Sequence, residues 1–132
     1  MIYYSKFKNE NAGDLKSKLI NDEPVIIFGT GNFGVIVCTA LEKIGIKIQG
    51  FADNNEANWG STFNGYKVYS HSEIIESFSD RSFIIASLSY VFIKKQLSKF
   101  GIKHFFDCDF LFSLIDLNSF LIFFFSLFLI LT

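Results

Sequence analysis

The sequence predicts an α/β fold, in which a small, doubly wound and mostly parallel sheet is followed by an apolar C-terminal segment. Three observations predict this architecture. Short apolar runs of β-forming residues alternate with stretches whose apolar residues recur every three or four positions. A glycine-rich turn joins the first run to the first long helical stretch. The composition then changes near residue 110, beyond which charged residues almost disappear.

The predicted elements alternate along the chain. Residues 25–28 are a continuous apolar run, which is typical of a strand covered on both faces. Asn64-Gly65 predicts a tight hairpin turn, and Ser70 with Glu73 predicts a capping box that opens a helix. The expected set is helices over 11–20, 33–44, 70–78 and 91–100, strands over 25–28, 46–52, 82–86 and 102–106, and a hairpin within 59–68.

Length and charge limit the function. The chain has 132 residues, enough for one domain, and we place that domain at residues 1–109 with its core at 24–107. Hydrophobic residues make up 50% of the chain and charged residues 19%, which is against a disordered protein. The formal net charge is −1 and no basic tract is present, so we expect no nucleic-acid partner. We expect a cytoplasmic location.

The turn after the first strand carries the pattern G-x-G-x-x-G, from Gly29 to Gly34. Gly29 permits the tight turn, Gly31 lets a pyrophosphate approach the backbone, and Gly34 lets the helix pack closely on the strand. The N-terminus of that helix offers free N–H groups and the positive end of its dipole. Asp53 stands 19 residues after Gly34, at the end of the second expected strand, where a carboxylate accepts hydrogen bonds from a ribose.

This pattern yields a set of candidate cofactor-binding residues in the turn and at the end of the second expected strand. They are Gly29, Thr30, Gly31, Asn32, Phe33, Gly34, Asp53 and Asn54. A plainer interpretation stays open at this point: the glycines serve only a tight strand-to-helix turn, and Asp53 is an ordinary turn residue.

Five segments together resemble a Rossmann-like accessory domain found in bacterial surface-polysaccharide biosynthesis proteins, where it is fused to glycosyltransferases and to FkbM-type methyltransferases. It is also similar to the N-terminal domain of nucleotide-sugar acetyltransferases. The segments are VIIFGTG at 25–31, GFADNN at 50–55, WG at 59–60, GYKV at 65–68 and SHSEI at 70–74. One departure is His71, where relatives usually carry proline after the capping serine.

The resemblance implies a domain that binds a nucleotide, a nucleotide-sugar or a dinucleotide such as NAD, in association with a saccharide-biosynthesis enzyme. Relatives usually carry a second, catalytic domain, and this chain ends soon after the last expected strand. We therefore favour a binding domain or a truncated fragment over a complete enzyme. The alternatives are an NAD-dependent oxidoreductase or epimerase, a sugar-modifying transferase, and a membrane-associated structural subunit.

Other chemically suggestive residues have structural interpretations that we prefer. Tyr90 and Lys94 match Y-x-x-x-K, the acid–base pair of short-chain dehydrogenases, but they follow the third core strand, too early in the sheet. The two histidines and the two cysteines lack the spacing of a metal site. We expect Trp59 to anchor its loop rather than stack on a base. The histidines are His71 and His104, and the cysteines are Cys38 and Cys108.

The C-terminal segment, residues 110–132, is strongly apolar. It holds 7 of the 18 phenylalanines and a single charge, Asp116. Three interpretations stay open: the product of a frameshift in AT-rich DNA, a membrane anchor that would hold the domain at the inner face of the cytoplasmic membrane, or a segment that binds a partner. The anchor must include Asp116, at a cost of about 3 kcal/mol, to reach the length that a bilayer requires.

Overall fold

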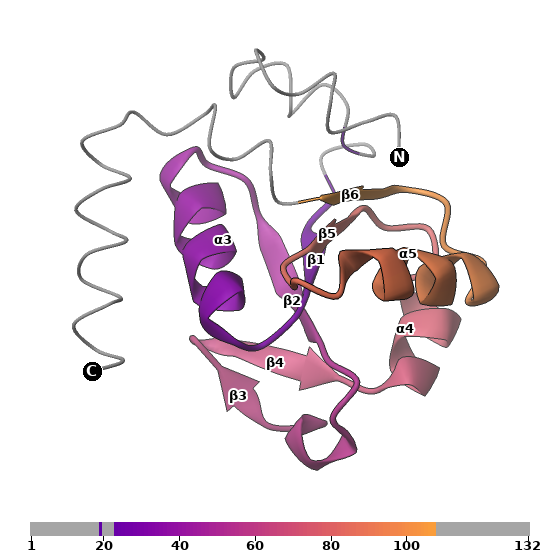
Figure 1. Cartoon of the computed structure of the whole chain (residues 1–132). Coiled ribbons are helices and arrows are strands. Elements are labelled where there is room, and N and C mark those ends of the chain that lie inside the picture. The colour runs from indigo at the N-terminus through magenta and orange to yellow at the C-terminus, as the bar shows by residue number, and fades with distance from the viewer. Residues whose placement is uncertain (1–18, 20–22, 108–132) are drawn as a thin grey trace.

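The computed structural model describes residue 19 and residues 23–107. In this part the chain forms one six-stranded sheet with three α-helices and a short 3-10 turn, and the predicted α/β fold is confirmed (Figure 1). The strands are β1 (Val25–Phe28), β2 (Ile48–Ala52), β3 (Thr62–Phe63), β4 (Tyr66–Tyr69), β5 (Phe83–Ile85) and β6 (Phe105–Asp107). The helices are α3 (Asn32–Lys43), α4 (His71–Ser77) and α5 (Tyr90–Lys99), and the 3-10 turn η1 spans Glu56–Asn58.

The strand order in the sheet is β3-β4-β2-β1-β5-β6. Every neighbouring pair is parallel except β3 with β4, which form the hairpin predicted from Asn64-Gly65. Both turn residues have positive φ, +51° and +88°, as a two-residue hairpin turn requires. Because β1 lies between β2 and β5, the chain leaves the centre of the sheet first toward one edge and later toward the other.

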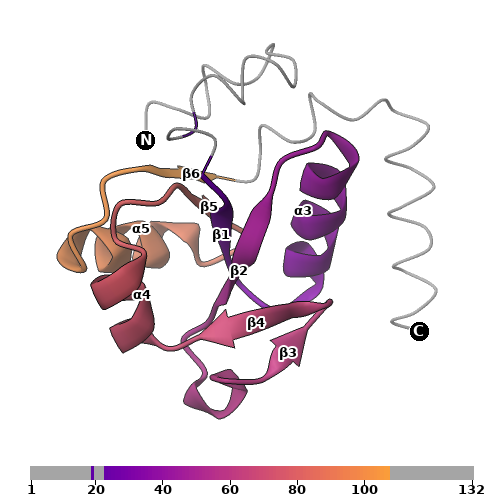
Figure 2. The same ribbon diagram turned by 180° about the vertical axis from the view of Figure 1, so that it is seen from behind.

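Helices cover both faces of the sheet: α3 lies on one face, and α4 and α5 lie on the other (Figure 1), as the view from behind also shows (Figure 2). Two apolar clusters fill the spaces between them. Val25 and Ile27 of β1 face α3, whereas Ile26 and Phe28 face α4 and α5, and all four side chains are buried. The continuous apolar run of β1 is thus explained, because neither of its faces meets solvent.

Two predicted strands begin too early. Ile46 and Ile102 are buried, but β2 begins only at Ile48 and β6 only at Phe105. The backbone amides of Ile46 and Ile102 donate to the carbonyls of Leu41 and Leu97, so both residues still belong to the turns that close the preceding helices. An apolar side chain at such a position packs into the core without extending the strand.

Two predicted segments fall outside the described residues: the helix expected over 11–20, apart from residue 19, and the apolar segment 110–132. Within the described residues, no helix combines the length and the apolar character needed to span a bilayer. The choice among the three interpretations of residues 110–132 therefore stays open.

The predicted capping box is present at the start of α4. The Ser70 hydroxyl accepts from the backbone N–H of Glu73 at 3.2 Å, and the Glu73 carboxylate accepts from the backbone N–H of Ser70 at 3.0 Å. We expect Ser70→Ala to lower the free energy of unfolding by about 1 kcal/mol, because one orphan amide loses its acceptor. Urea denaturation would measure this loss. Ser72→Ala, at an exposed position of the same turn, is the control, and an equal loss there would contradict the interpretation.

Candidate functional site

A hollow of about 360 Å³ opens at the carboxyl ends of β1 and β5. It lies where the chain turns from β1 toward one edge of the sheet and from β5 toward the other, the switch point at which open α/β sheets bind ligands. The turn after β1, the end of β2 and the turn after β5 contribute its walls. The lining residues are Gly29, Thr30, Gly31, Asn32, Phe33, Asp53, Ala86, Ser87 and Leu88.

Close packing fixes the path of the turn after β1. Gly29 has φ +129°, and a Cβ built there would come closer than 3.0 Å to the carbonyl oxygen of Ala86. A Cβ at Gly34 would collide in the same way with the carbonyl oxygen of Gly29. The Gly29 N–H donates to the carbonyl of Ala52 at 2.8 Å. The turn is thereby held between β2 and β5, and α3 begins directly above the end of β1.

The N-terminus of α3 is open toward the hollow. Gly31 is its N-cap residue and has no side chain to accept from the first turn, and no acidic residue lies in that turn. Nothing lies within 4 Å of the position that a Gly31 Cβ would occupy. The first backbone N–H groups of a helix have no intrahelical acceptor and carry the positive end of its dipole. The hollow therefore presents uncapped donors to an anion.

Asp53 is held rigidly at the side of the hollow. Its Oδ2 accepts from the Thr30 hydroxyl and from the Asn58 side-chain amide, the latter at 2.9 Å, and its Oδ1 accepts from the Asn55 backbone N–H at 3.1 Å. Trp59 donates its indole N–H to the Asp53 carbonyl at 2.7 Å. Trp59 thus anchors this loop, as predicted.

The environment of Asp53 keeps its side chain ionised. Partial burial acts to raise the pKa of the carboxyl, but the hydrogen bonds from Thr30, Asn58 and the backbone outweigh it, so the pKa lies below its usual value. A charged carboxylate therefore stands beside the turn at neutral pH.

A family model described as C2185-like, N-terminal, matches residues 21–105. The chain belongs to this family. No curated protein matches it. The matched range covers all six strands of this C2185-like domain except the last two residues of β6.

Solved structures of RSP, a Rex-family repressor, are similar to the domain in fold. The repressor alone has a TM-score of 0.50 at 23% identity, over 72% of this chain and 50% of that chain. The complex with beta-NADH has a TM-score of 0.48 at 24% identity, over 64% and 44%. The complex with beta-NAD+ and operator DNA has a TM-score of 0.49 at 23% identity, over 64% and 42%.

This C2185-like domain thus spans half or less of the length of the repressors that it matches. At this level of identity the likeness shows the fold, and the ligands belong to the repressor. The operator DNA in one complex is a ligand of the repressor, and our expectation of no nucleic-acid partner stays a prediction for this chain. The association with saccharide biosynthesis is not shown by these comparisons either.

The structure brings six of the eight predicted site residues together around the hollow. Gly34 does not line it and instead permits the close contact with Gly29. Asn54 turns away and forms a reciprocal amide pair with Gln96 of α5, at 2.7 and 3.0 Å. Three lining residues were missed: Ala86, Ser87 and Leu88. These residues directly follow β5, whose apolar run predicts a buried strand, and this position was the one available signal. The sequence does not show that β5 lies beside β1.

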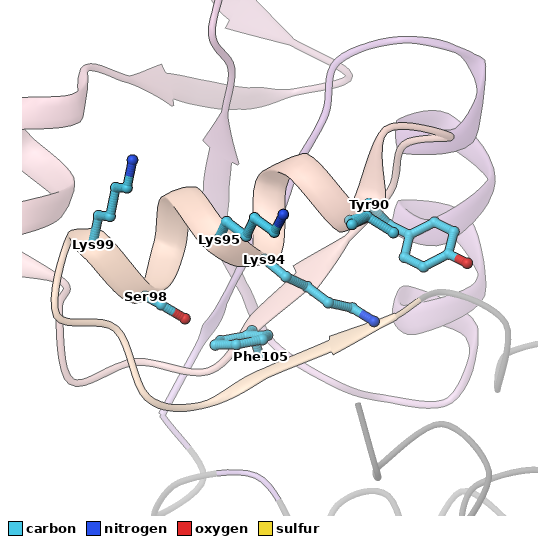
Figure 3. Close-up of a pocket in the computed structure, with 7 residues that line it drawn as sticks. Tyr90, Lys94, Lys95, Ser98, Lys99 and Phe105 are labelled. Carbon is cyan, nitrogen blue, oxygen red and sulfur yellow. The ribbon is translucent and has the colours of Figure 1, made fainter.

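The Y-x-x-x-K pair is engaged in packing. The Lys94 ammonium lies 2.8 Å from the Asp107 carboxylate and 4.7 Å from the centre of the Tyr90 ring. Both residues belong to α5 (Figure 3), and neither lines the hollow at the glycine turn. Lys94 therefore stabilises the end of β6 and is directed to the face of Tyr90 rather than to its hydroxyl. This arrangement supports our structural interpretation of the pair.

The other suggestive residues also have structural surroundings. The His71 ring lies between the rings of Trp59 and Phe100, with centroids 4.8 and 5.1 Å away. Cys38 is fully buried, and burial raises the pKa of its thiol to about 11. His104 is exposed, and Cys108 lies outside the described residues. No group of three metal-binding side chains occurs in the part of the chain that the structure describes.

Two glycines of the turn are expected to respond differently to a methyl group. Gly34→Ala should lower the free energy of unfolding by about 1–3 kcal/mol, because its Cβ must displace the carbonyl of Gly29. Gly31→Ala should change it by less than about 0.5 kcal/mol, because the space there is open and φ is −90°. Urea denaturation of both variants checks this, and equal losses would contradict the packing described for the turn.

The lowered pKa of Asp53 predicts that its contribution to the free energy of unfolding is lost in acid. A carboxyl whose pKa is lowered by folding contributes stability above its unfolded value, 3.8, and this contribution is lost as the pH falls through the folded value. Asp53→Asn should therefore be less stable than the wild type near pH 7, and the difference should shrink below pH ~4. Thermal melts across this range measure the difference. Asp80→Asn, at an exposed position, is the control, and a difference for Asp53→Asn that is constant with pH would refute the assignment.

Proposed function

We propose that this domain binds a nucleotide or nucleotide-sugar, with the diphosphate at the N-terminus of α3 and the ribose at Asp53. The observation that carries the proposal is the uncapped first turn of α3, which faces an open hollow at the switch point of the sheet. An anion at that position accepts from N–H groups that have no acceptor within the helix. A phosphate also gains from the helix dipole.

Gly31 leaves room for a phosphate beside the backbone donors of α3. The space around it allows a phosphate oxygen to reach the backbone, and any side chain there would occupy the same space. Thr30 and Asn32 flank it in the wall of the hollow. A diphosphate that extends along the turn can therefore reach these backbone donors.

Asp53 supports a ribose at one end of that diphosphate. Its Oδ2 already accepts from two side chains, whereas its Oδ1 accepts from the Asn55 amide and has capacity for a further donor. A ribose hydroxyl supplies such a donor. Thr30 contacts Asp53 and also lines the turn, so the two halves of the site are held together.

Diphosphate and ribose are common to NAD and to nucleotide-sugars, and both stay candidates. The resemblance of the motifs at 25–31, 50–55 and 65–74 to accessory domains of surface-polysaccharide enzymes favours a nucleotide-sugar and a saccharide-biosynthesis partner. The NAD(H) complexes are of the repressor, and they make NAD the first alternative to test.

A thermal-shift screen of the full chain tests the proposal, with NAD, NADP, UDP-sugars, GDP-sugars, coenzyme A and S-adenosylmethionine as probes. A ligand at 100 times its dissociation constant stabilises the native state by about 2.7 kcal/mol, which raises the melting midpoint measurably. We expect such a shift with one ligand class in the wild type, and its loss in Gly31→Val, because the added side chain fills the approach to the phosphate.

Lys47→Val is the matched control, since Lys47 is exposed and directly precedes β2, at the amino ends of the strands and so opposite the hollow. It should retain the full shift. The proposal is wrong if no probe shifts the folded protein, or if Gly31→Val responds as the wild type does.

A further inference from the structure

Large apolar side chains gather on the surface where α5 begins. Four of the five exposed large apolar residues in the described part of the chain lie within residues 88–92: Leu88, Tyr90, Val91 and Phe92, at 82, 40, 55 and 63% exposure. The fifth is Ile75 of α4. Such a concentration of exposed apolar side chains marks an interaction site.

The same part of the chain carries only positive charge. From residue 82 to residue 106 the sequence has four lysines and no aspartate or glutamate, although the whole chain has a net charge of −1. Lys94 pairs with Asp107. Lys95 and Lys99, one helical turn apart, are exposed, and so is Lys103 in the connection to β6. Lys95 is one helical turn from Val91, and Lys99 and Lys103 continue the positive charge toward β6.

A groove runs along the outer side of α5. It has a volume of about 740 Å³ and is lined by Val91 and by the six residues labelled in Figure 3. The α5 residues of the lining form two rows with a spacing of four, so the groove follows the length of the helix. Phe105 of β6 contributes an aromatic side chain beneath the helix. The surface thus combines apolar side chains, lysines and a depression along one helix.

We propose that this α5 surface, comprising residues 88–92 with Lys95, Lys99 and Lys103, docks the domain on an anionic lipid bilayer. Apolar side chains enter the boundary between headgroups and acyl chains, and the lysines along α5 and after it meet the anionic headgroups. Nucleic acid would satisfy the lysines and could stack on Tyr90 and Phe92, but it would leave the aliphatic Leu88 and Val91 without an apolar partner. A bilayer accommodates both the aliphatic and the aromatic side chains of this surface.

This docking surface is separate from any contact through residues 110–132 and does not rest on nucleotide binding. Only Leu88 belongs both to it and to the wall of the glycine-turn hollow. The two proposals can therefore fail independently.

Co-sedimentation of the full chain with lipid vesicles tests the inference. One set of vesicles is phosphatidylcholine alone, and the other contains about one third phosphatidylglycerol, an anionic lipid. We expect selective binding to the anionic vesicles that falls as salt rises to about 0.5 M. The full chain keeps residues 110–132 in every sample, so a difference in binding between variants is due to the substituted residues.

Variants assign the binding to the α5 surface. Lys95→Glu/Lys99→Glu should weaken binding to anionic vesicles about tenfold or more, because two lysines near the headgroups are reversed. Phe92→Ser should weaken it severalfold. Lys47→Glu and Ile75→Ser, at exposed positions elsewhere on the domain, are the matched controls and should bind as the wild type does.

Three outcomes would overturn the proposal. The first is equal binding of the wild type and the α5 variants, which assigns any membrane contact to another part of the chain. The second is no preference for anionic over neutral vesicles. The third is binding of the wild type to single-stranded or duplex DNA that the α5 variants lose, in the absence of vesicle binding.

Discussion

The contact of two backbone carbonyls with two glycines determines the geometry of the functional end of this domain. Gly29 passes beneath the carbonyl of Ala86, and Gly34 passes beneath the carbonyl of Gly29, with no room for a side chain at either place. These contacts bring the end of β1, the start of α3 and the end of β5 together. This packing places the uncapped turn of α3 beside the hollow, and it makes Ala86, Ser87 and Leu88 the wall that the sequence did not predict. Asp53 joins them because β2 pairs with β1 and Thr30 reaches its carboxylate.

The apolar clusters on the two faces of the sheet stabilise this close packing. The central strand β1 is buried on both faces. The glycine turn that follows it therefore starts from a firmly packed strand. The polar groups of the site are then placed by short loops. Asp53 is fixed by side chains from two loops and by a backbone amide, and the indole of Trp59 holds its carbonyl. An ionised carboxylate near the uncapped helix is stable here because its hydrogen bonds outweigh its partial burial.

Features with a local cause could be predicted from the sequence, and features that depend on distant neighbours could not. The hairpin at Asn64-Gly65 and the capping box at Ser70 need only a few consecutive residues, and both are present. The reciprocal pair of Asn54 with Gln96 joins residues 42 positions apart, and no local pattern indicates it. Leu88 was missed for the same reason, because the sequence does not show which strand lies beside β1. The early starts predicted for β2 and β6 arose because burial alone does not distinguish a strand from the turn before it.

The connection from β5 to α5 links the hollow to the α5 surface. Ala86 packs on the glycine turn, Ser87 and Leu88 line the hollow, and Tyr90 begins the helix that carries the exposed apolar residues and lysines. If both proposals hold, a ligand that covers Leu88 removes apolar area from the α5 surface, and a bilayer that covers Leu88 narrows the mouth of the hollow. Because such coupling is reciprocal, the sign of the effect of a nucleotide on vesicle binding equals the sign of the effect of vesicles on nucleotide binding. Leu88 therefore couples the affinity for a nucleotide to the affinity for a bilayer, although each proposal rests on its own set of residues.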